Sequence, residues 1–345
     1  MRLRCEEGRI LPGCPWRAVY AGREEMNEAA TLSLTDRFRG CILGQAVGDA
    51  VAAPFEGMPA DAIYYGFGSA RKILAKPPVD ELVYTDDTQM MIGIAETLIA
   101  LGGIDEQHLC DAFVGNYDPG RGYGPGAREI LEKVAAGGDW RELAKHIFPG
   151  GSLGNGAAMR AAPIGLLFHG DLDRVEREAE RSSVVTHTHP VGIDGARLIA
   201  LATALAMRMS VFNGKRFYAE LMARAKTEEF RYQLSIASRL TLDDSVATLG
   251  NRLEADQSVV TAIACFTSHP SSYVDAVGRA LGLGGDVDTL AAMTGALVGA
   301  HLGIGAVPGH LLQLLENGSK GRDFLLRLAT DLLETHQRHA HGGQK

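Results

Sequence analysis

Apolar and small residues recur along most of this chain at the spacing of amphipathic or buried helices, with little of the alternation typical of strands. The spacing predicts helices within residues 38–57, 89–101, 127–137, 157–168, 195–209, 272–283 and 290–303. Strand-like runs are few and short, such as RSSVV at residues 181–185. No Pro-rich or Ser-rich linker divides the middle of the chain. We therefore expect an all-α fold, with one large domain of orthogonally packed helices over residues 33–340.

Glycines interrupt two of the predicted helices at a regular spacing. They fall four residues apart at Gly40, Gly44 and Gly48, and again at Gly295, Gly299 and Gly303. Residues four apart lie on one face of a helix, and glycine weakens a helix unless something compensates. We expect the compensation to be the close approach of another backbone.

Composition and charge narrow the class of protein. The chain has 345 residues, of which 46% are hydrophobic and 22% charged, and its net charge is −8. Length alone would suggest two domains, but the uninterrupted helical pattern favours one. The acidic balance argues against broad binding to nucleic acid or to anionic membranes, so no direct nucleic-acid binding is expected.

The cysteines and the N-terminus bear on the compartment. The five cysteines (Cys5, Cys14, Cys41, Cys110 and Cys265) are widely spaced and form no CxxC pair, which fits a reducing environment. Glu6 and Glu7 stand where a secretory signal would need an apolar run, and residues 1–32 are expected to form an extension. The apolar stretches at residues 198–207 and 291–305 are shorter than a membrane span. A cytoplasmic protein without membrane contact is expected.

Two short acidic clusters stand where helices are expected to begin, at residues 84–88 (YTDDT) and 284–289 (GGDVDT). Capping of a helix is the ordinary use of such residues, although it explains poorly the density of paired acids beside glycines. If the clusters meet, four carboxylates converge and repel one another unless a cation is present. Oxygen ligands favour Mg²⁺, Mn²⁺ or Ca²⁺ over zinc. In a two-metal site Asp288 could lie between the ions, with the hydroxyls of Thr85 and Thr289 completing their shells.

A glycine-rich segment, PGGSLGNG at residues 149–156, precedes a helix-like stretch. Such a turn exposes N–H groups that can hold phosphate oxygens, although it can also be a plain turn. It matches the G-x-S-x-G pattern of a nucleophile elbow at Gly150, Ser152 and Gly154. An elbow needs a preceding strand, and KHIFP at residues 145–149 is too short and ends in proline.

Two further segments carry groups that could bind a ligand. His187 and His189 alternate in THTHP, but no cysteine partner or H-E-x-x-H pattern supports zinc, so capping or a half-buried histidine is the commoner outcome. The loop DPGRGYGPG at residues 118–126 is explained mostly by turn chemistry. Its composition also suits a loop shaped around a ligand.

In this order, the segments resemble the ADP-ribosylglycohydrolase family, the ADP-ribosyl-acceptor hydrolases. The matching stretches are residues 40–57, 84–90, 118–126, 151–165, 186–196 and 284–303. The TDDT and DVDT signatures with GNGAAMR between them are very specific in combination. The resemblance implies an all-α fold, a two-metal centre usually holding Mg²⁺ or Mn²⁺, and hydrolysis of the bond between ADP-ribose and its acceptor.

Carried over by position, the resemblance also implies a set of site residues. The implied metal ligands are Thr85, Asp86, Asp87, Asp286, Asp288 and Thr289, with Glu56 lying over the metals and governing access to them. The implied catalytic residues are Glu56, Asp87 and Asp286. The implied diphosphate loop comprises Gly151, Ser152, Gly154, Asn155 and Gly156, while His187, Gly122 and Tyr123 match ribose contacts.

One position departs from the family pattern and bears on the substrate. Leu153 stands where the branch that acts on serine-linked ADP-ribose has an aromatic, so adenine stacking must be weaker or come from Phe148. The RGYG loop is closest to the O-linked branch, which also handles O-acetyl-ADP-ribose. Arginine-linked substrates, a non-catalytic ADP-ribose binder, and a serine hydrolase that uses Ser152 with His187 or His189 are the alternatives.

Overall fold

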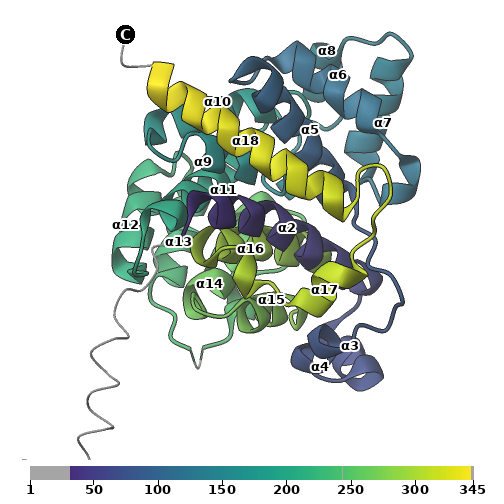
Figure 1. Ribbon diagram of the computed structural model, residues 1–345. Helices are drawn as coiled ribbons and strands as arrows, with labels where there is room; N and C mark the ends of the chain where they lie inside the picture. The colour runs from purple at the N-terminus through teal and green to yellow at the C-terminus, as the bar shows by residue number, and fades with distance from the viewer. Residues whose placement is uncertain (1–31, 243, 343–345) are drawn as a thin grey trace, which may run out of the picture. The chain divides into compact units, whose positions relative to one another are not determined.

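The computed structural model describes residues 32–242 and 244–342, so nearly all of the predicted extension at residues 1–32 lies outside the described residues. From residue 34 onward, the described residues group into one compact unit. Within the described ranges no β-strand forms, only three isolated bridges, and the predicted all-α fold is confirmed. Figure 1 shows the arrangement of the helices.

The helices fall into two consecutive groups along the chain. The first group is α2 (Leu34–Ala52), α3 (Ala60–Phe67), α4 (Ala70–Ala75), α5 (Asp86–Leu101), α6 (Glu106–Asn116), α7 (Pro125–Ala135), α8 (Trp140–His146), α9 (Ala162–Leu167) and α10 (Leu172–Ser183). The second group is α11 (Pro190–Arg208), α12 (Gly214–Arg224), α13 (Glu228–Ala237), α14 (Ala255–Ser268), α15 (Tyr273–Leu281), α16 (Val287–Leu302), α17 (Gly309–Leu314) and α18 (Arg322–Gly342). Short 3-10 turns η1 (Ala53–Phe55), η2 (Pro119–Arg121), η3 (Asn155–Ala157), η4 (Val246–Leu249) and η5 (Ile304–Ala306) connect them.

The two glycine series face each other across the central helix pair α2 and α16. A Cβ at Gly44 would lie 2.5 Å from the carbonyl oxygen of Gly295, and a Cβ at Gly40 or Gly299 would overlap the backbone of the other. The expected close approach of a second backbone is therefore confirmed, and the second backbone belongs to the other glycine-bearing helix. The two helices run in opposite directions, because the start of α2 meets the end of α16.

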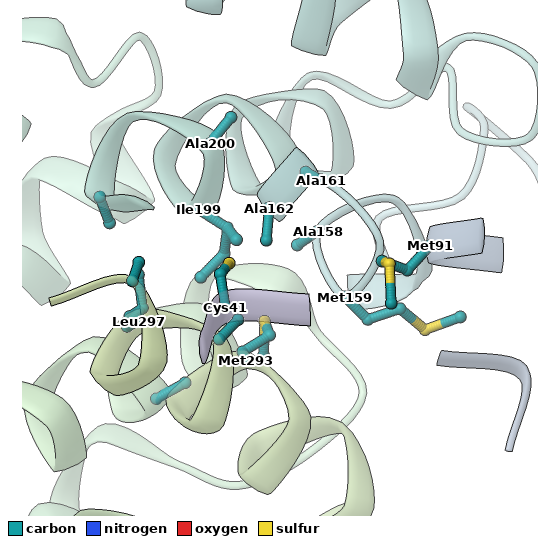
Figure 2. Close-up of a cluster of buried hydrophobic side chains, with 14 of the residues drawn as sticks. Cys41, Met91, Ala158, Met159, Ala161, Ala162, Ile199, Ala200, Met293 and Leu297 are labelled. Carbon is teal, nitrogen blue, oxygen red and sulfur yellow. The ribbon is translucent and has the colours of Figure 1, made fainter. Parts of the chain in front are cut away.

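Around this pair the core is built largely from small and flexible side chains. Cys41 of α2 lies among Met293 and Leu297 of α16 and Ile199 of α11, with alanines of the segment before α9 nearby (Figure 2). Arg37 is buried at the end of the pair and donates to the carbonyls of Ala206 and Ala300. It thereby satisfies carbonyls in the last turns of α11 and α16, which have no partner within their own helix.

Two sequence expectations are corrected by the helices. RSSVV is not a strand, because residues 181–183 end α10, whose buried positions Leu172, Val175 and Ala179 follow helical spacing. The apolar stretch at residues 198–207 was expected to be too short for a membrane span. Helix α11, which contains it, is long and apolar enough to cross a membrane by length and composition. However, 89% of its apolar window is buried inside the structure, as for a core helix.

Candidate metal and ligand site

A pocket of about 560 Å³ opens where the N-terminal ends of α5 and α16 meet. Every site residue predicted from the sequence lines it except Thr85. These are Glu56, Asp86, Asp87, Gly122, Tyr123, Phe148, Gly151, Ser152, Leu153, Gly154, Asn155, Gly156, His187, Asp286, Asp288 and Thr289. The segments quoted for the family resemblance thus come together in one cavity, within the size range of ligand pockets.

The acidic clusters sit on the helices themselves and do not serve as side-chain caps. Helix α5 begins at Asp86, three residues earlier than the sequence pattern suggested, so its two acids occupy the first turn. Thr85 and Asp286 are the N-cap residues of α5 and α16, yet neither side chain makes a capping hydrogen bond. The side chains are therefore free for other partners, and both helix dipoles direct their positive ends toward the carboxylates.

The two clusters meet. The hydroxyl of Thr85 lies 3.2 Å and that of Thr289 lies 3.4 Å from the same oxygen, Oδ2 of Asp87. Glu56, Asp286 and Asp288 each offer a carboxylate oxygen, and these oxygens lie within 4.8 Å of one another. Glu56 is exposed at the end of η1, whereas the two aspartates are buried. The convergence of carboxylates that a metal site requires is present.

Burial and mutual repulsion shift the pKa values of these acids upward. The pKa of Asp86 is raised to about 7, mainly by burial and then by the charges of Asp49 and Glu56. The pKa of Asp286 is raised to about 6, again mainly by burial. For Asp87 and Asp288, burial and neighbouring carboxylates raise the pKa well above its ordinary value. Such a group is costly to ionise unless a cation compensates it.

Two buried oxygens fit the binding of a cation. Oδ1 of Asp87 and Oδ1 of Asp288 are buried and have no hydrogen-bond partner among the described residues. Buried polar atoms are almost always satisfied, so these oxygens call for a partner that the protein does not supply. With only carboxylates and hydroxyls around them, the donor set suits a hard divalent ion such as Mg²⁺ or Mn²⁺.

Asp49 of α2 was not predicted from the sequence, yet it is bound directly to the acidic segment at the start of α5. Its carboxylate accepts hydrogen bonds from the backbone N–H of Thr85 (3.0 Å) and of Thr88 (3.1 Å). It also accepts from both threonine hydroxyls, at 2.8 and 2.6 Å. Asp49 is fully buried, and this burial raises its pKa to about 6. It holds the first turn of α5 in place, so the glycine-bearing helix α2 positions the acidic cluster.

The glycine-rich segment forms a loop along one wall of the pocket. Gly150 and Gly151 have φ of 81° and 86°, a conformation that other residues rarely adopt. The amides of Ser152, Leu153 and Gly156 donate to no backbone carbonyl of the described residues, so they are available to a ligand oxygen. The loop has the exposed amides expected of a phosphate-binding turn.

The same loop is tied to two neighbouring segments. The side-chain amide of Asn155 donates to Oδ2 of Asp286 at 2.5 Å, which joins the loop to the acidic cluster. The backbone of Asn155 donates to Leu253, and that of Ala255 donates to Leu153, so residues 253–255 back the loop. Leu253 and Glu254 line the pocket, and no sequence motif marks them.

The nucleophile-elbow interpretation lacks its geometry. The segment before the loop is helix α8 and not a strand. Ser152 Oγ accepts a hydrogen bond from Gly154, while Nδ1 of His187 is engaged by Thr186. His189 caps α11 by accepting from Val191, as the capping interpretation expected for one of these histidines. Neither imidazole is hydrogen-bonded to the serine.

The loop of residues 118–126, which carries Tyr123, is held against α5. Tyr123 is buried, and its hydroxyl donates to the side chain of Gln89 at 2.9 Å. Arg121 pairs with Glu316 and donates to the carbonyl of Tyr84 at 2.7 Å. Asp118 accepts from the amide of Gly120, which is the turn chemistry predicted for the loop. The loop therefore forms a fixed wall next to the acidic cluster.

An apolar rim surrounds the mouth of the pocket. Phe148, Leu153 and Leu253 are 42%, 39% and 64% exposed, although all three are large and apolar. The ring of Phe148 lies against Gly126, where a Cβ would come within 2.6 Å of it. Exposed apolar side chains around a pocket are typical of a surface that contacts a flat or apolar part of a ligand.

Comparisons with known proteins agree with the geometry. The sequence profile of the ADP-ribosylglycohydrolase family matches residues 30–342. An uncharacterized protein of Archaeoglobus fulgidus is 33% identical over 88% of this chain and 98% of its own length. ADP-ribosylhydrolase ARH3 is 31% identical in Danio rerio, over 81% of this chain and 86% of the relative, and 31% identical in Homo sapiens, over 79% and 87%.

A solved structure, an ADP-ribosylglycohydrolase-related protein complex, shares the fold with a TM-score of 0.67. It is 24% identical and covers 88% of this chain and 99% of its own. Together with the family match, which spans all the described residues, this shows that the chain belongs to the ADP-ribosylglycohydrolase family, whose members are hydrolases acting on ADP-ribosyl bonds.

Proposed function

We propose that this protein removes ADP-ribose from an O-linked acceptor, serine or acetate, in a reaction that depends on two Mg²⁺ or Mn²⁺ ions. The observation that carries the proposal is the convergence of two acidic clusters at one end of the pocket. The preference for the oxygen linkage rests on the RGYG loop and on the curated ARH3 relatives.

The ions would be held by residues of both clusters and of the segment before α3. These residues are Glu56, Thr85, Asp86, Asp87, Asp286, Asp288 and Thr289. Divalent cations in such a site supply Lewis acidity toward ribose oxygens and water. Asn155 and Asp49 are not among these ligands, but each holds one of the acidic segments in place. Asn155 donates to Asp286 at the start of α16, and Asp49 accepts from Thr85 at the start of α5.

The protein's own groups then account for proton transfer and access. Hydrolysis adds water to the anomeric carbon, and the acceptor oxygen leaves with a proton. Glu56 is exposed to solvent, and its carboxylate oxygen lies within 4.8 Å of the oxygens offered by Asp286 and Asp288, a position from which it can serve in proton transfer. We assign proton transfer or control of access to Glu56. Full turnover by Glu56→Gln would show that assignment to be wrong.

The rest of the pocket suits the ADP part of the ligand. The free amides of Ser152, Leu153 and Gly156 can donate hydrogen bonds to the diphosphate oxygens without added charge. Phe148 offers the aromatic face on which a base can stack, and Leu153 and Leu253 add apolar contacts. Phe148 thus supplies the aromatic ring that is missing at position 153, where this chain has a leucine.

The acceptor is tested by measuring ADP-ribose release from matched serine-linked and arginine-linked ADP-ribosylated peptides in Mg²⁺. The proposal predicts release from the serine-linked peptide and little from the arginine-linked one. Preferential release from the arginine-linked peptide would overturn the assigned linkage. Binding of ADP-ribose with no release from either peptide would favour the non-catalytic binder.

A further inference from the structure

Three polar side chains form a hydrogen-bonded chain in the wall of the pocket. Nη2 of Arg160 donates to Oγ1 of Thr186 at 2.9 Å, and this oxygen lies 2.7 Å from Nδ1 of His187. Arg160 is fully buried, Thr186 is 1% exposed and His187 is 5% exposed. Nη2 of Arg160 also donates to the carbonyl of Ser182, and the guanidinium stacks over the Phe113 ring. The chain is therefore fixed in position at its far end.

The chemistry of the three groups sets the direction of each hydrogen bond. A guanidinium can only donate, so the Thr186 hydroxyl accepts from Arg160. Among the described residues, Nδ1 of His187 is the one group within hydrogen-bonding distance that can accept the hydroxyl's own proton. If Nδ1 carried a proton and donated instead, the buried hydroxyl proton would have no acceptor, which is rare in folded proteins. Nδ1 is therefore unprotonated, and the ring proton is on Nε2.

The opposite edge of the imidazole lies against the glycine-rich loop that lines the ligand cavity. A Cβ at Gly156 would lie 3.2 Å from Nε2, and one at Gly154 would lie 3.8 Å from it. Both glycines belong to the glycine-rich loop, and both line the pocket together with His187. Nε2 has no hydrogen-bond partner within residues 32–242 and 244–342. Burial and the charge of Arg160 lower the pKa of His187 to about 3, so the ring is neutral.

We propose that Arg160 and Thr186 are positioning residues that hold His187 as the neutral Nε2–H tautomer. The pocket then presents a hydrogen-bond donor at this point, which suits an oxygen acceptor such as a ribose hydroxyl or a phosphate oxygen. This inference deepens the proposed function and depends on it only for the activity measurement. The tautomer itself is a property of the protein without ligand.

The tautomer is read from the ¹⁵N chemical shifts of His187 in protein labelled at its histidines. His187→Gln identifies the signal, and the two ring nitrogens report separately which one carries the proton. The wild type and Thr186→Ser, which keeps the hydroxyl, are expected to show protonated Nε2 and unprotonated Nδ1. Thr186→Val keeps the side-chain shape without the hydroxyl, and it is expected to show protonation divided between the two nitrogens.

The same variants are compared in turnover of the serine-linked peptide. Thr186→Val is expected to lose about tenfold in kcat/KM, by analogy with the losses seen when the partner that orients a metal-bound histidine is removed. Thr186→Ser is expected to restore most of it, and circular dichroism confirms that each variant is folded. A wild-type spectrum with the proton on Nδ1 overturns the inference, as does a Thr186→Val protein with unchanged tautomer and turnover.

The two proposals fail separately. If neither peptide is cleaved, the proposed function fails, whereas the wild-type ¹⁵N spectrum still decides the tautomer. In that case the affinity of each variant for ADP-ribose is measured by calorimetry in place of turnover. Thr186→Val is again expected to be weaker than both the wild type and Thr186→Ser. Equal affinity of the wild type and Thr186→Val for ADP-ribose would then contradict the role assigned to Thr186.

Discussion

The hydroxyl of Thr289 lies 3.4 Å from Oδ2 of Asp87, although the two residues are 202 positions apart in the sequence. This contact joins the first turn of α16 to the first turn of α5. Helix α2 makes it possible, because its glycines let α16 pack closely against it while its Asp49 holds the start of α5. The same helix thus sets both halves of the acidic site.

The glycine stripe gives a prediction about stability. Gly299→Ala places a Cβ against the backbone of Gly40, and we expect a loss of about 1–3 kcal/mol in the free energy of unfolding. Gly115→Ala on α6 is the control, because nothing lies near its Cβ position, and it should gain up to about 1 kcal/mol. Urea unfolding measures both. Equal stability of the two variants would contradict the packing argument.

Asp49 is predicted to act through the threonines that it holds. In Asp49→Asn an amide N–H₂ group faces N–H donors, so we expect a loss of about 1–3 kcal/mol in stability. We also expect a higher Mg²⁺ concentration for half-maximal turnover, because the first turn of α5 is less well fixed. Asp331→Asn, an exposed acid on α18, is the control and should change neither quantity. If Asp49→Asn left the Mg²⁺ concentration for half-maximal turnover unchanged, Asp49 would have no role in positioning the metal site.

Repulsion among the buried carboxylates predicts opposite effects of one substitution with and without metal. Asp288→Asn removes a charge from the cluster, so the metal-free protein should melt at a higher temperature than the metal-free wild type. It should also gain less from added Mg²⁺, because a ligand has been lost. At a hundred times the Kd, the wild type should gain about 2.7 kcal/mol, or several degrees in Tm. A wild-type Tm that is insensitive to Mg²⁺ and to Mn²⁺ would contradict the prediction.

The lowered pKa of His187 predicts a pH dependence of folding. The folded ring stays neutral down to a pKa of about 3, whereas the unfolded ring takes up a proton near pH 6.5. Its contribution to stability is therefore full above pH 6.5 and is lost as pH falls from 6.5 toward 3. His187→Gln should lose less stability than the wild type between pH 7 and pH 4. An NMR titration in which His187 takes up a proton near pH 6.5 in the folded protein would refute this.

The apolar rim predicts a change in substrate affinity. Phe148→Ala should raise KM for an ADP-ribosylated peptide with little change in kcat, because stacking on a base contributes about 1–3 kcal/mol. Leu153→Tyr should lower KM by adding a second aromatic to the rim. Tyr232→Ala, an exposed aromatic on α13, serves as the control. No effect of Phe148→Ala on KM would place the base elsewhere.

Much of the fold and the pocket could be predicted from short-range patterns. Helical spacing was enough for the all-α fold, and glycines four apart were enough to indicate a close helix contact, but not which two helices form it. The strand prediction for RSSVV failed because serine and valine suit the end of an amphipathic helix as well as a strand. Short motifs rich in acidic, hydroxyl or glycine residues identified most of the residues that line the pocket.

The residues that were missed stand alone in apolar sequence. Asp49 is the one charged residue between Gly40 and Phe55, and Arg160 is the one charged residue between Gly150 and Leu167. A single charge in a buried helix must have partners, and this signal could have singled out both residues. Leu253 and Glu254 carry no such signal, because their place in the pocket depends on the long-range pairing of residues 253–255 with the glycine-rich loop.

The central claim is that the two acidic clusters form one metal-dependent hydrolytic centre. It is tested most directly by following ADP-ribose release from the preferred peptide in chelator-treated protein while Mn²⁺ is added back and bound Mn²⁺ is counted. We predict no release without metal, recovery in step with the binding of two ions per chain, and neither recovery nor full loading in Asp87→Asn. Release that persists in excess EDTA, with no Mn²⁺ bound, would contradict the account.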